Sequence, residues 1–144
     1  MSLFAALSVG ASGMAAERAR AEALTENLAN AETTRTPEGG PYRRKDVVFE
    51  SAPVSTPFSS VFDAQFQSVA GVQVAGVVTD TSAPEMRFLP GHPDANAEGY
   101  VAFPHINPAE DMVDLMDAAR NYEANIAAMS AVKDMIQKSI DLLH

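Results

Sequence analysis

One stretch decides the fold: residues 107–143, NPAEDMVDLMDAARNYEANIAAMSAVKDMIQKSIDLL. Asn107 is a favoured N-cap residue and Pro108 suits the first helical position. Glu110 stands three residues after the cap, as in a capping box. No Gly or Pro follows Pro108 in this stretch. At about 1.5 Å per residue it forms a rod of roughly 50 Å, which is coiled-coil length.

Apolar residues in this stretch recur in two heptad columns. The columns are Met112, Ala119, Ile126, Lys133 and Ile140, and Leu115, Tyr122, Met129, Ile136 and Leu143. Only Lys133 interrupts the apolar pattern. A seven-residue repeat is typical of helices that pack along a seam, so we predict a long helix over residues 107–144 that pairs with a second helix.

The N-terminal residues 1–31 repeat this pattern more weakly. Their columns are Leu7, Met14, Ala21 and Leu28, and Leu3, Gly10, Glu17, Leu24 and Ala31. Gly10 and Gly13 each cost about 1 kcal/mol relative to Ala inside a helix. We therefore expect residues 15–31 to form the firm part of the helix. Residues 1–13 should be helical only when something packs on them, and disordered in the isolated monomer.

The sequence pattern of the middle, residues 32–106, predicts strands and turns. All nine prolines lie between Pro37 and Pro108, as do six of the eight glycines. Runs with β-branched or aromatic residues predict strands over 46–50, 59–66, 71–80, 84–89 and 99–103. Gly76 in a valine-rich run suggests a β-bulge. The fold class is therefore α+β: long N- and C-terminal helices paired as a coiled coil, with a small irregular β-rich middle module.

Composition narrows the function classes. Apolar residues make up 47% of the chain, which is typical of a globular protein. A formal net charge of −9 argues against nucleic acid as a partner. The chain has no cysteine for a disulfide or a thiolate zinc site. The N-terminus lacks the basic segment of a secretory signal, so we expect a protein that stays inside the cell or leaves without leader cleavage.

Two amphipathic helices of this length carry more apolar surface than a small β module can cover. Alanines flank the C-terminal seam and would allow further helices to approach closely: Ala118, Ala124, Ala127, Ala128 and Ala131. We therefore predict that the helices pack with copies or relatives from other chains.

Three blocks of the chain resemble those of bacterial flagellar axial proteins. They are LTENLANAETTRTPEGGPYRRKDVVF (24–49), GVQVAGVVTDTSAPEMRFLPGHPDANAEGYVAFPHIN (71–107) and MVDLMDAARNYEANIAAMSAVKDMIQKSIDLL (112–143). Within that group the chain resembles the proximal rod proteins of the C type. The resemblance covers nearly the whole chain, and residues 51–70 match weakly.

The resemblance implies a structural subunit of the flagellar basal-body rod, the drive shaft between the membrane ring and the hook. Its terminal helices would pair and stack with neighbouring subunits into a tube that spans the periplasm. The implied partners are copies of the chain, other rod proteins, the membrane-ring/rod adaptor and the flagellar type III export apparatus, with export that cleaves no leader. The resemblance implies no enzymatic activity, cofactor or small-molecule substrate.

The predicted subunit interface leaves some alternatives open. Asn27 and Asn30 either end a helix, where Asn tolerates a left-handed backbone, or contact another subunit, as the resemblance favours. Residues 43–45, Arg-Arg-Lys, are either solvated or bridged to an acidic face of Asp111, Asp114 and Asp117. The full predicted interface comprises Leu24, Asn27, Leu28, Asn30, Arg43, Arg44, Leu115, Arg120, Tyr122, Asn125, Ile126, Met129 and Ile136.

For the seam residues of this set, an intrachain core is the alternative to intersubunit contact. Asn121, Tyr122 and Asn125 share a helical face, where they either lie at the edge of a core with satisfied hydrogen bonds or contact a neighbouring subunit. The choice depends on which side of the helix faces its intrachain partner.

Two function classes compete with the structural one. His92 and Asp94, together with His105, could suggest a metal site or a small hydrolase. Asp in such a turn commonly bonds its own backbone, and no further ligand or nucleophile completes a set at recognisable spacing. We therefore predict no metal and no catalysis. The other alternative is a cytoplasmic coiled-coil adaptor.

Overall fold

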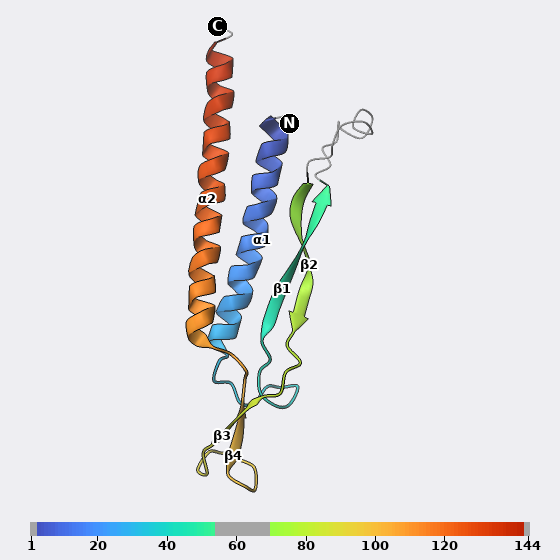
Figure 1. Cartoon of the computed structure of the whole chain (residues 1–144), viewed down its shortest axis with the longest axis vertical. Coiled ribbons are helices and arrows are strands. Elements are labelled where there is room, and N and C mark those ends of the chain that lie inside the picture. Colours follow the sequence, from blue (N-terminus) through green and yellow to red (C-terminus); the bar gives the residue numbers. More distant parts are fainter. Residues whose placement is uncertain (1–2, 54–69, 143–144) are drawn as a thin grey trace.

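The computed structural model describes residues 3–53 and 70–142 and is α+β (Figure 1). Its elements are α1 (Leu3–Ala29), β1 (Lys45–Pro53), β2 (Ala70–Thr79), β3 (Glu85–Phe88), β4 (Tyr100–Phe103) and α2 (Pro108–Asp141). The strands expected over 46–50, 71–80, 84–89 and 99–103 are confirmed with shifted ends. The strand expected over 59–66 lies outside the described residues. Neither α1 nor α2 is long and apolar enough to cross a membrane.

The molecule is elongated, and its helices lie side by side (Figure 1). Helix α1 lies between α2 and the antiparallel β1–β2 hairpin. The second antiparallel pair, β3–β4, lies at the end of the molecule far from both termini. Helix α2 extends beyond the start of α1, so its C-terminal turns have no intrachain neighbour from α1.

Helix α2 begins where its sequence predicts. Asn107 is the N-cap, and its side-chain oxygen accepts a hydrogen bond of 3.2 Å from the backbone N–H of Ala109. Pro108 follows the cap, and Glu110 and Asp111 place negative charge in the first turn, where the helix dipole favours it.

The two glycines of α1 mark the places where α2 comes closest. A Cβ atom on Gly10 would lie 2.9 Å from Met129 Cγ, and one on Gly13 would lie 3.0 Å from Asn125 Nδ2. The residues that weaken α1 as an isolated helix are therefore those that admit α2. Helix α1 is continuous from Leu3 with α2 packed on it. That its first turns are disordered in an isolated monomer stays a prediction.

The seam of α2 that faces α1 differs by one residue from the expected pattern. In the column with Leu115, Tyr122, Met129 and Ile136, Tyr122 is exposed and the other three residues are half-buried, as expected of a packed seam. The other expected column is exposed, with 52% of Met112 and 44% of Ile126 accessible to solvent.

The second inward column starts instead at Asp111 and runs through Ala118, Asn125 and Val132. Asp111 and Ala118 are each 1% exposed. The apolar pattern missed this column because polar residues, Asp111 and Asn125, occupy two of its four positions.

The β1–β2 hairpin turns an apolar face towards α1. Val47 pairs with Val77, and Phe49 pairs with Val74. The register shifts between Val48 and Phe49, which confirms the expected bulge. Val74 and Val77 are three residues apart, so regular alternation would place them on opposite faces of the sheet. The extra residue of the bulge places both on the face that carries Val47 and Phe49. The hydroxyl of Ser12 on α1 accepts a 3.1 Å hydrogen bond from the Val72 N–H of β2.

In the β3–β4 pair, β4 has buried side chains on one face, whereas all four residues of β3 are exposed. Val101 and Phe103 are buried, whereas Phe88 and Tyr100 meet edge to face on the outside, with ring centroids 5.3 Å apart. Gly99 precedes β4 with φ +84°, and a Cβ atom there would lie 2.9 Å from Phe88 Cε2. The turn therefore needs glycine for both its backbone conformation and its close packing.

Gly99→Ala should destabilise the β3–β4 turn more than Gly39→Ala destabilises the loop before β1. Both glycines have positive φ, but a Cβ on Gly39 would meet nothing within 4 Å. We expect about 1 kcal/mol for Gly39→Ala from backbone strain alone, and about 2–3 kcal/mol for Gly99→Ala, where Phe88 and Pro90 must also move. Urea denaturation of both variants measures the difference, and equal losses would contradict the packing argument.

Candidate subunit interface

A polar cluster joins the helix pair to the sheet; its members are Asn27, Tyr42, Arg44, Lys45 and Asp111. Asn27 is fully buried near the end of α1. Its side-chain oxygen accepts hydrogen bonds from the Lys45 N–H at 2.9 Å and from the Tyr42 hydroxyl at 3.0 Å. Its side-chain amide donates to the Lys45 carbonyl oxygen at 2.8 Å. One amide therefore fixes where β1 begins relative to the end of α1.

The partners of Asn27 are themselves held in place. Burial, helped by the negative charge of Glu26, raises the pKa of Tyr42 to about 12, so its hydroxyl keeps its proton and donates at neutral pH. The Lys45 ammonium lies 2.5 Å from a carboxylate oxygen of Glu26, one residue before Asn27. Lys45 therefore contacts α1 through both its backbone and its side chain.

Arg44 reaches from the same loop to the start of α2. Its Nη2 atom lies 3.2 Å from Asp111 Oδ1 and 4.0 Å from Asp114 Oδ2. Its Nε atom lies 3.3 Å from Asp46 Oδ1. The salt bridge to an acidic face of α2 is thus confirmed for Arg44, whereas Asp117 pairs within α2 instead.

The other members of that charge run and its acidic face behave differently. Arg43 is exposed, as a solvated residue should be. Asp117 lies 3.7 Å from Arg120 Nη1 on its own helix, and both side chains are exposed. Such an exposed pair contributes little to stability.

Asp111 is the buried charge of the cluster. It is 1% exposed, and neither of its carboxylate oxygens has a hydrogen-bond partner, although Arg44 is within ion-pair distance. Burial raises the pKa of Asp111, while the Arg44 charge lowers it and Asp114 and Asp46 raise it further. Desolvation of the two charges offsets most of their attraction, so the ion pair adds little net stability. Its main effect is to favour the observed arrangement of loop and helix over others.

The seam between α1 and α2 contains further polar residues. Asn121 donates a 3.3 Å hydrogen bond to Glu17 Oε1, and the other oxygen of Glu17 is buried without a hydrogen-bond partner. The Asn125 amide lies against Gly13. Both asparagines therefore contact the intrachain partner helix.

The sequence-predicted interface residues fall into two groups. Those that are buried or half-buried within the chain, or engaged by it, are Leu24, Asn27, Leu28, Asn30, Arg44, Leu115, Asn125, Met129 and Ile136. Those that are exposed on the surface of the chain are Arg43, Arg120, Tyr122 and Ile126. Asn27, fully buried, offers no surface to another subunit in this conformation, so its part in an interface is indirect.

Asn30 ends α1 through its side chain rather than through a left-handed backbone. Its amide donates to the Glu26 carbonyl oxygen at 2.9 Å, and its side-chain oxygen accepts from the Thr33 hydroxyl at 3.1 Å. Positive φ occurs only at glycines in the described part of the chain.

Sequence reasoning missed Tyr42, Lys45 and the burial of Asp111. A lone tyrosine between a Pro-Gly loop and a basic run gave a weak signal for a buried hydroxyl. The bridge from Arg44 to Asp111 was among the sequence-based alternatives, but a carboxylate in the first turn of a helix gives no sign that it is buried.

The turn with His92 and Asp94 has structural contacts. Asp94 Oδ2 accepts a 2.8 Å hydrogen bond from the Thr34 hydroxyl, and Arg35 lies 3.7 Å from Asp94 Oδ1. His92 Nδ1 accepts from the Asp94 N–H. His105 lies instead near Asp80. Within residues 3–53 and 70–142, no three His, Asp or Glu side chains could hold a metal ion together.

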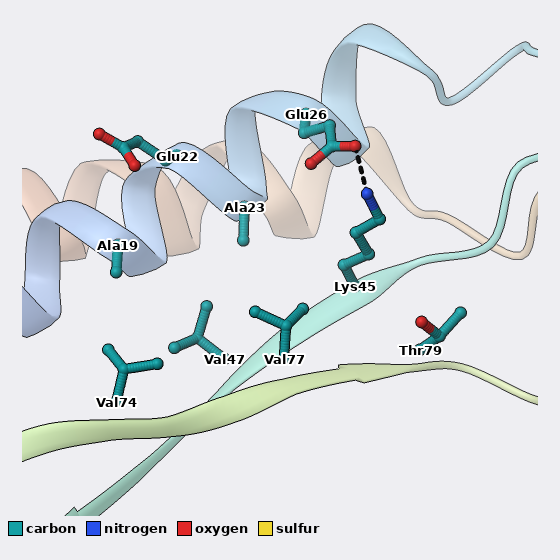
Figure 2. A pocket seen from close by; sticks show the side chains of 9 residues that line it. All are labelled: Ala19, Glu22, Ala23, Glu26, Lys45, Val47, Val74, Val77 and Thr79. Carbon is teal, nitrogen blue, oxygen red and sulfur yellow. Dashed lines mark hydrogen bonds and ion pairs between the residues drawn. The ribbon is translucent and has the colours of Figure 1, made fainter.

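A groove of about 470 Å³ lies between α1 and the β1–β2 hairpin (Figure 2). Its lining comprises Ala19, Glu22, Ala23 and Glu26 from α1, and Lys45, Val47, Val74, Val77 and Thr79 from the hairpin. Apolar side chains point into it from both sides, with the Glu26–Lys45 ion pair at one end. Together with the exposed column of α2, it gives the described part of the chain two surfaces with exposed apolar side chains that no other described residue covers.

The helical ends of the chain match the models of two flagellar basal-body rod families, which gives its class. Residues 7–35 match the family described as Flagella basal body rod protein. Residues 97–142 match the family described as Flagellar basal body rod FlgEFG protein C-terminal.

Full-length relatives give the particular family. The chain is 41% identical to the flagellar basal-body rod protein FlgC of Bacillus subtilis, over 99% of each chain. It is 36% identical to FlgC of Salmonella typhimurium, over 99% of this chain and 98% of that one. The chain belongs to the FlgC family of flagellar basal-body rod proteins. It is a structural rod subunit of the flagellar basal body, where it associates with other rod components.

Asn27→Ala should destabilise the chain by about 3 kcal/mol, because it leaves buried hydrogen-bonding groups of Tyr42 and Lys45 without partners. Asn30→Ala is the matched control and should cost less than about 1 kcal/mol, since its side chain bonds only within its own segment. Urea denaturation gives both values. Hydrogen exchange at the Lys45 amide should accelerate only in the Asn27 variant, and unchanged protection there would contradict the assigned role.

Asp111→Asn should change how stability depends on pH. The folded-state pKa of Asp111 is raised, so the folded state binds this proton more tightly than the unfolded chain. The contribution of Asp111 to the free energy of unfolding is therefore greatest below the pKa that this group has in the unfolded chain. It declines as the pH rises through the pKa of the group in the folded state. The Asn variant lacks this decline, so its free energy of unfolding relative to the native chain should rise from about pH 4 to pH 7. Asp114→Asn is the control, and parallel pH profiles for the native chain and Asp111→Asn would refute the prediction.

Proposed function

We propose that the chain is a subunit of the proximal rod that polymerises through its terminal helices. The resulting drive shaft transmits torque from the membrane ring to the distal rod and hook. Family membership supports the rod, and the exposed column of α2 supports the mode of assembly.

That column is the observation that carries the proposal. Met112 and Ile126 of that column, and Met116 beside it, leave between 44% and 52% of their surface exposed, on a side of α2 that does not face α1. Complete burial of such side chains is worth about 1.5–3 kcal/mol each, so covering the exposed half drives association by roughly 1 kcal/mol per residue. A soluble monomer gains nothing from an apolar column facing water.

The pairing of α1 and α2 as an antiparallel coiled coil is part of the proposal. Successive contacts join Gly10 to Met129, Gly13 to Asn125, and Glu17 to Asn121. Each step advances by three or four residues along one helix and retreats by four along the other. This spacing supports a regular seam between antiparallel helices.

Torque transmission needs the helices and the sheet to move together. The polar cluster supplies that connection, since Lys45 is held by α1 and Arg44 by α2. We assign torque to many such contacts rather than to one attachment point.

The remaining partners follow from the same proposal. They are copies of the chain, the membrane-ring/rod adaptor and the flagellar type III export apparatus, and the assembled rod spans the periplasm after export without leader cleavage. No catalytic role is proposed, because the contacts of Asp94 with Thr34 and Arg35 give the His92 turn a structural purpose.

Ile126→Asp and Met129→Asp should separate assembly from folding. Ile126 is 44% exposed, so an aspartate there should change monomer stability by less than about 1 kcal/mol yet block assembly, because the charge would be buried between subunits. Met129 faces Gly10, so an aspartate there should also destabilise the monomer, by about 2–4 kcal/mol. Swimming motility and thermal unfolding are measured for both. Normal swimming by the Ile126 variant would refute an interface at this column.

A further inference from the structure

The groove between α1 and the hairpin and the exposed flank of α2 fit one another. From the proposed rod function, on which this inference rests, we infer that the groove of one copy receives the α2 flank of a second copy. The flank comprises Met112, Met116, Ala119, Glu123 and Ile126.

The groove exists because α1 presents alanines where the sheet presents valines. Val74 and Val77 lie on the side of the hairpin that faces α1, yet they are 40% and 56% exposed. Ala19 and Ala23 across from them are too short to reach (Figure 2). Close packing is the rule in protein interiors, so a gap of about 470 Å³ in which alanines face valines calls for side chains from elsewhere.

The flank has the shape of a ridge. Its members follow one another at spacings of four, three, four and three residues, so they lie along one side of α2. Met112 and Met116 are each 52% exposed. Methionine is unbranched and adapts to irregular gaps, which suits a groove lined by short side chains.

Charge fixes which way the ridge lies in the groove. Glu22 and Glu26 line one wall of the groove, where Glu22 pairs with the exposed Arg18 and Glu26 pairs with Lys45 at the end of the groove. On α2, Glu123 lies within the flank and Arg120 lies beside it, where the Arg120 side chain is 76% exposed and pairs only with the exposed Asp117. Docking therefore sets Arg120 against the acidic wall and Glu123 towards Lys45. A groove-to-groove dimer would instead place the two glutamates against their own copies.

The contact joins two different surfaces of the same chain. Such a heterologous contact leaves a free groove on one copy and a free ridge on the other, so addition continues until a ring closes or a helix grows. A subunit of a tubular shaft needs this kind of contact.

Cysteine cross-linking tests the inference directly, because the chain contains no cysteine. Val77→Cys is combined with Met116→Cys in the only copy of the protein in swimming cells, and basal bodies are treated with a flexible bismaleimide. Val78→Cys replaces Val77→Cys in one control: Val77 and Val78 are each 56% exposed, and adjacent strand residues point to opposite faces. Met135→Cys replaces Met116→Cys in the other, with 50% and 52% exposure at the two positions.

The expected result is a ladder of multimers of this chain from Val77→Cys with Met116→Cys, several-fold stronger than from either control pair. Equal ladders from the controls, no ladder in cells that swim, or a Val77→Cys product containing a different protein would overturn the second-copy assignment. Absence of the chain from basal bodies would refute the rod function itself, and the inference with it.

If the two cysteine substitutions block assembly, a charge exchange tests the same contact between the groove and the α2 flank. Arg120→Glu and Glu22→Arg should each reduce swimming, and the two together should restore it, because the exchanged charges attract again across the contact. Lack of restoration would overturn the assigned orientation and pairing.

Discussion

The structure depends on one buried amide. Asn27 has no accessible surface, and its three hydrogen bonds to Tyr42 and Lys45 satisfy polar groups that could not otherwise leave water. They fix the point at which the chain leaves α1 and enters β1. Arg44, between the same two residues, then reaches Asp111 and sets the start of α2. Removing one member of this cluster would leave its partners buried without hydrogen bonds, at the full free-energy cost of their desolvation.

Polar residues inside the helix seam favour specificity over stability. Asp111, Asn125 and Glu17 occupy positions where leucine would bind the helices more tightly. A buried polar group tolerates few alternative registers, because a shifted helix would leave it unpaired. The antiparallel alignment of α1 and α2 is thus set by hydrogen bonding and charge, while apolar area is left over on the outside of α2. That division of roles suits a subunit whose helices must find both an intrachain partner and neighbours.

The surfaces of the chain follow the same logic. The outer column of α2 and the groove beside α1 expose apolar side chains that nothing in residues 3–53 and 70–142 covers. Each is bordered by charges, Arg120 and Glu123 for one and Glu22 and Lys45 for the other, and charge restricts how apolar surfaces meet. In a family of rod proteins, such surfaces are the means by which a small α+β protein becomes part of a larger shaft.

The sequence by itself determined the helices, four of the strands, the cap at Asn107 and the bulge beside Gly76, because these depend on local periodicity and backbone preference. The blocks around residues 24–49 and 112–143 also determined the family. Only the tertiary structure decided that α1 faces the column of Asp111 and Asn125 rather than that of Met112 and Ile126. It also decided that Asn27 is buried within the chain and that Arg44 rather than Arg43 forms the bridge. These outcomes depend on contacts between residues that are far apart in the sequence. The identity of a polar residue does not reveal whether the folded chain supplies a buried hydrogen-bond partner for it.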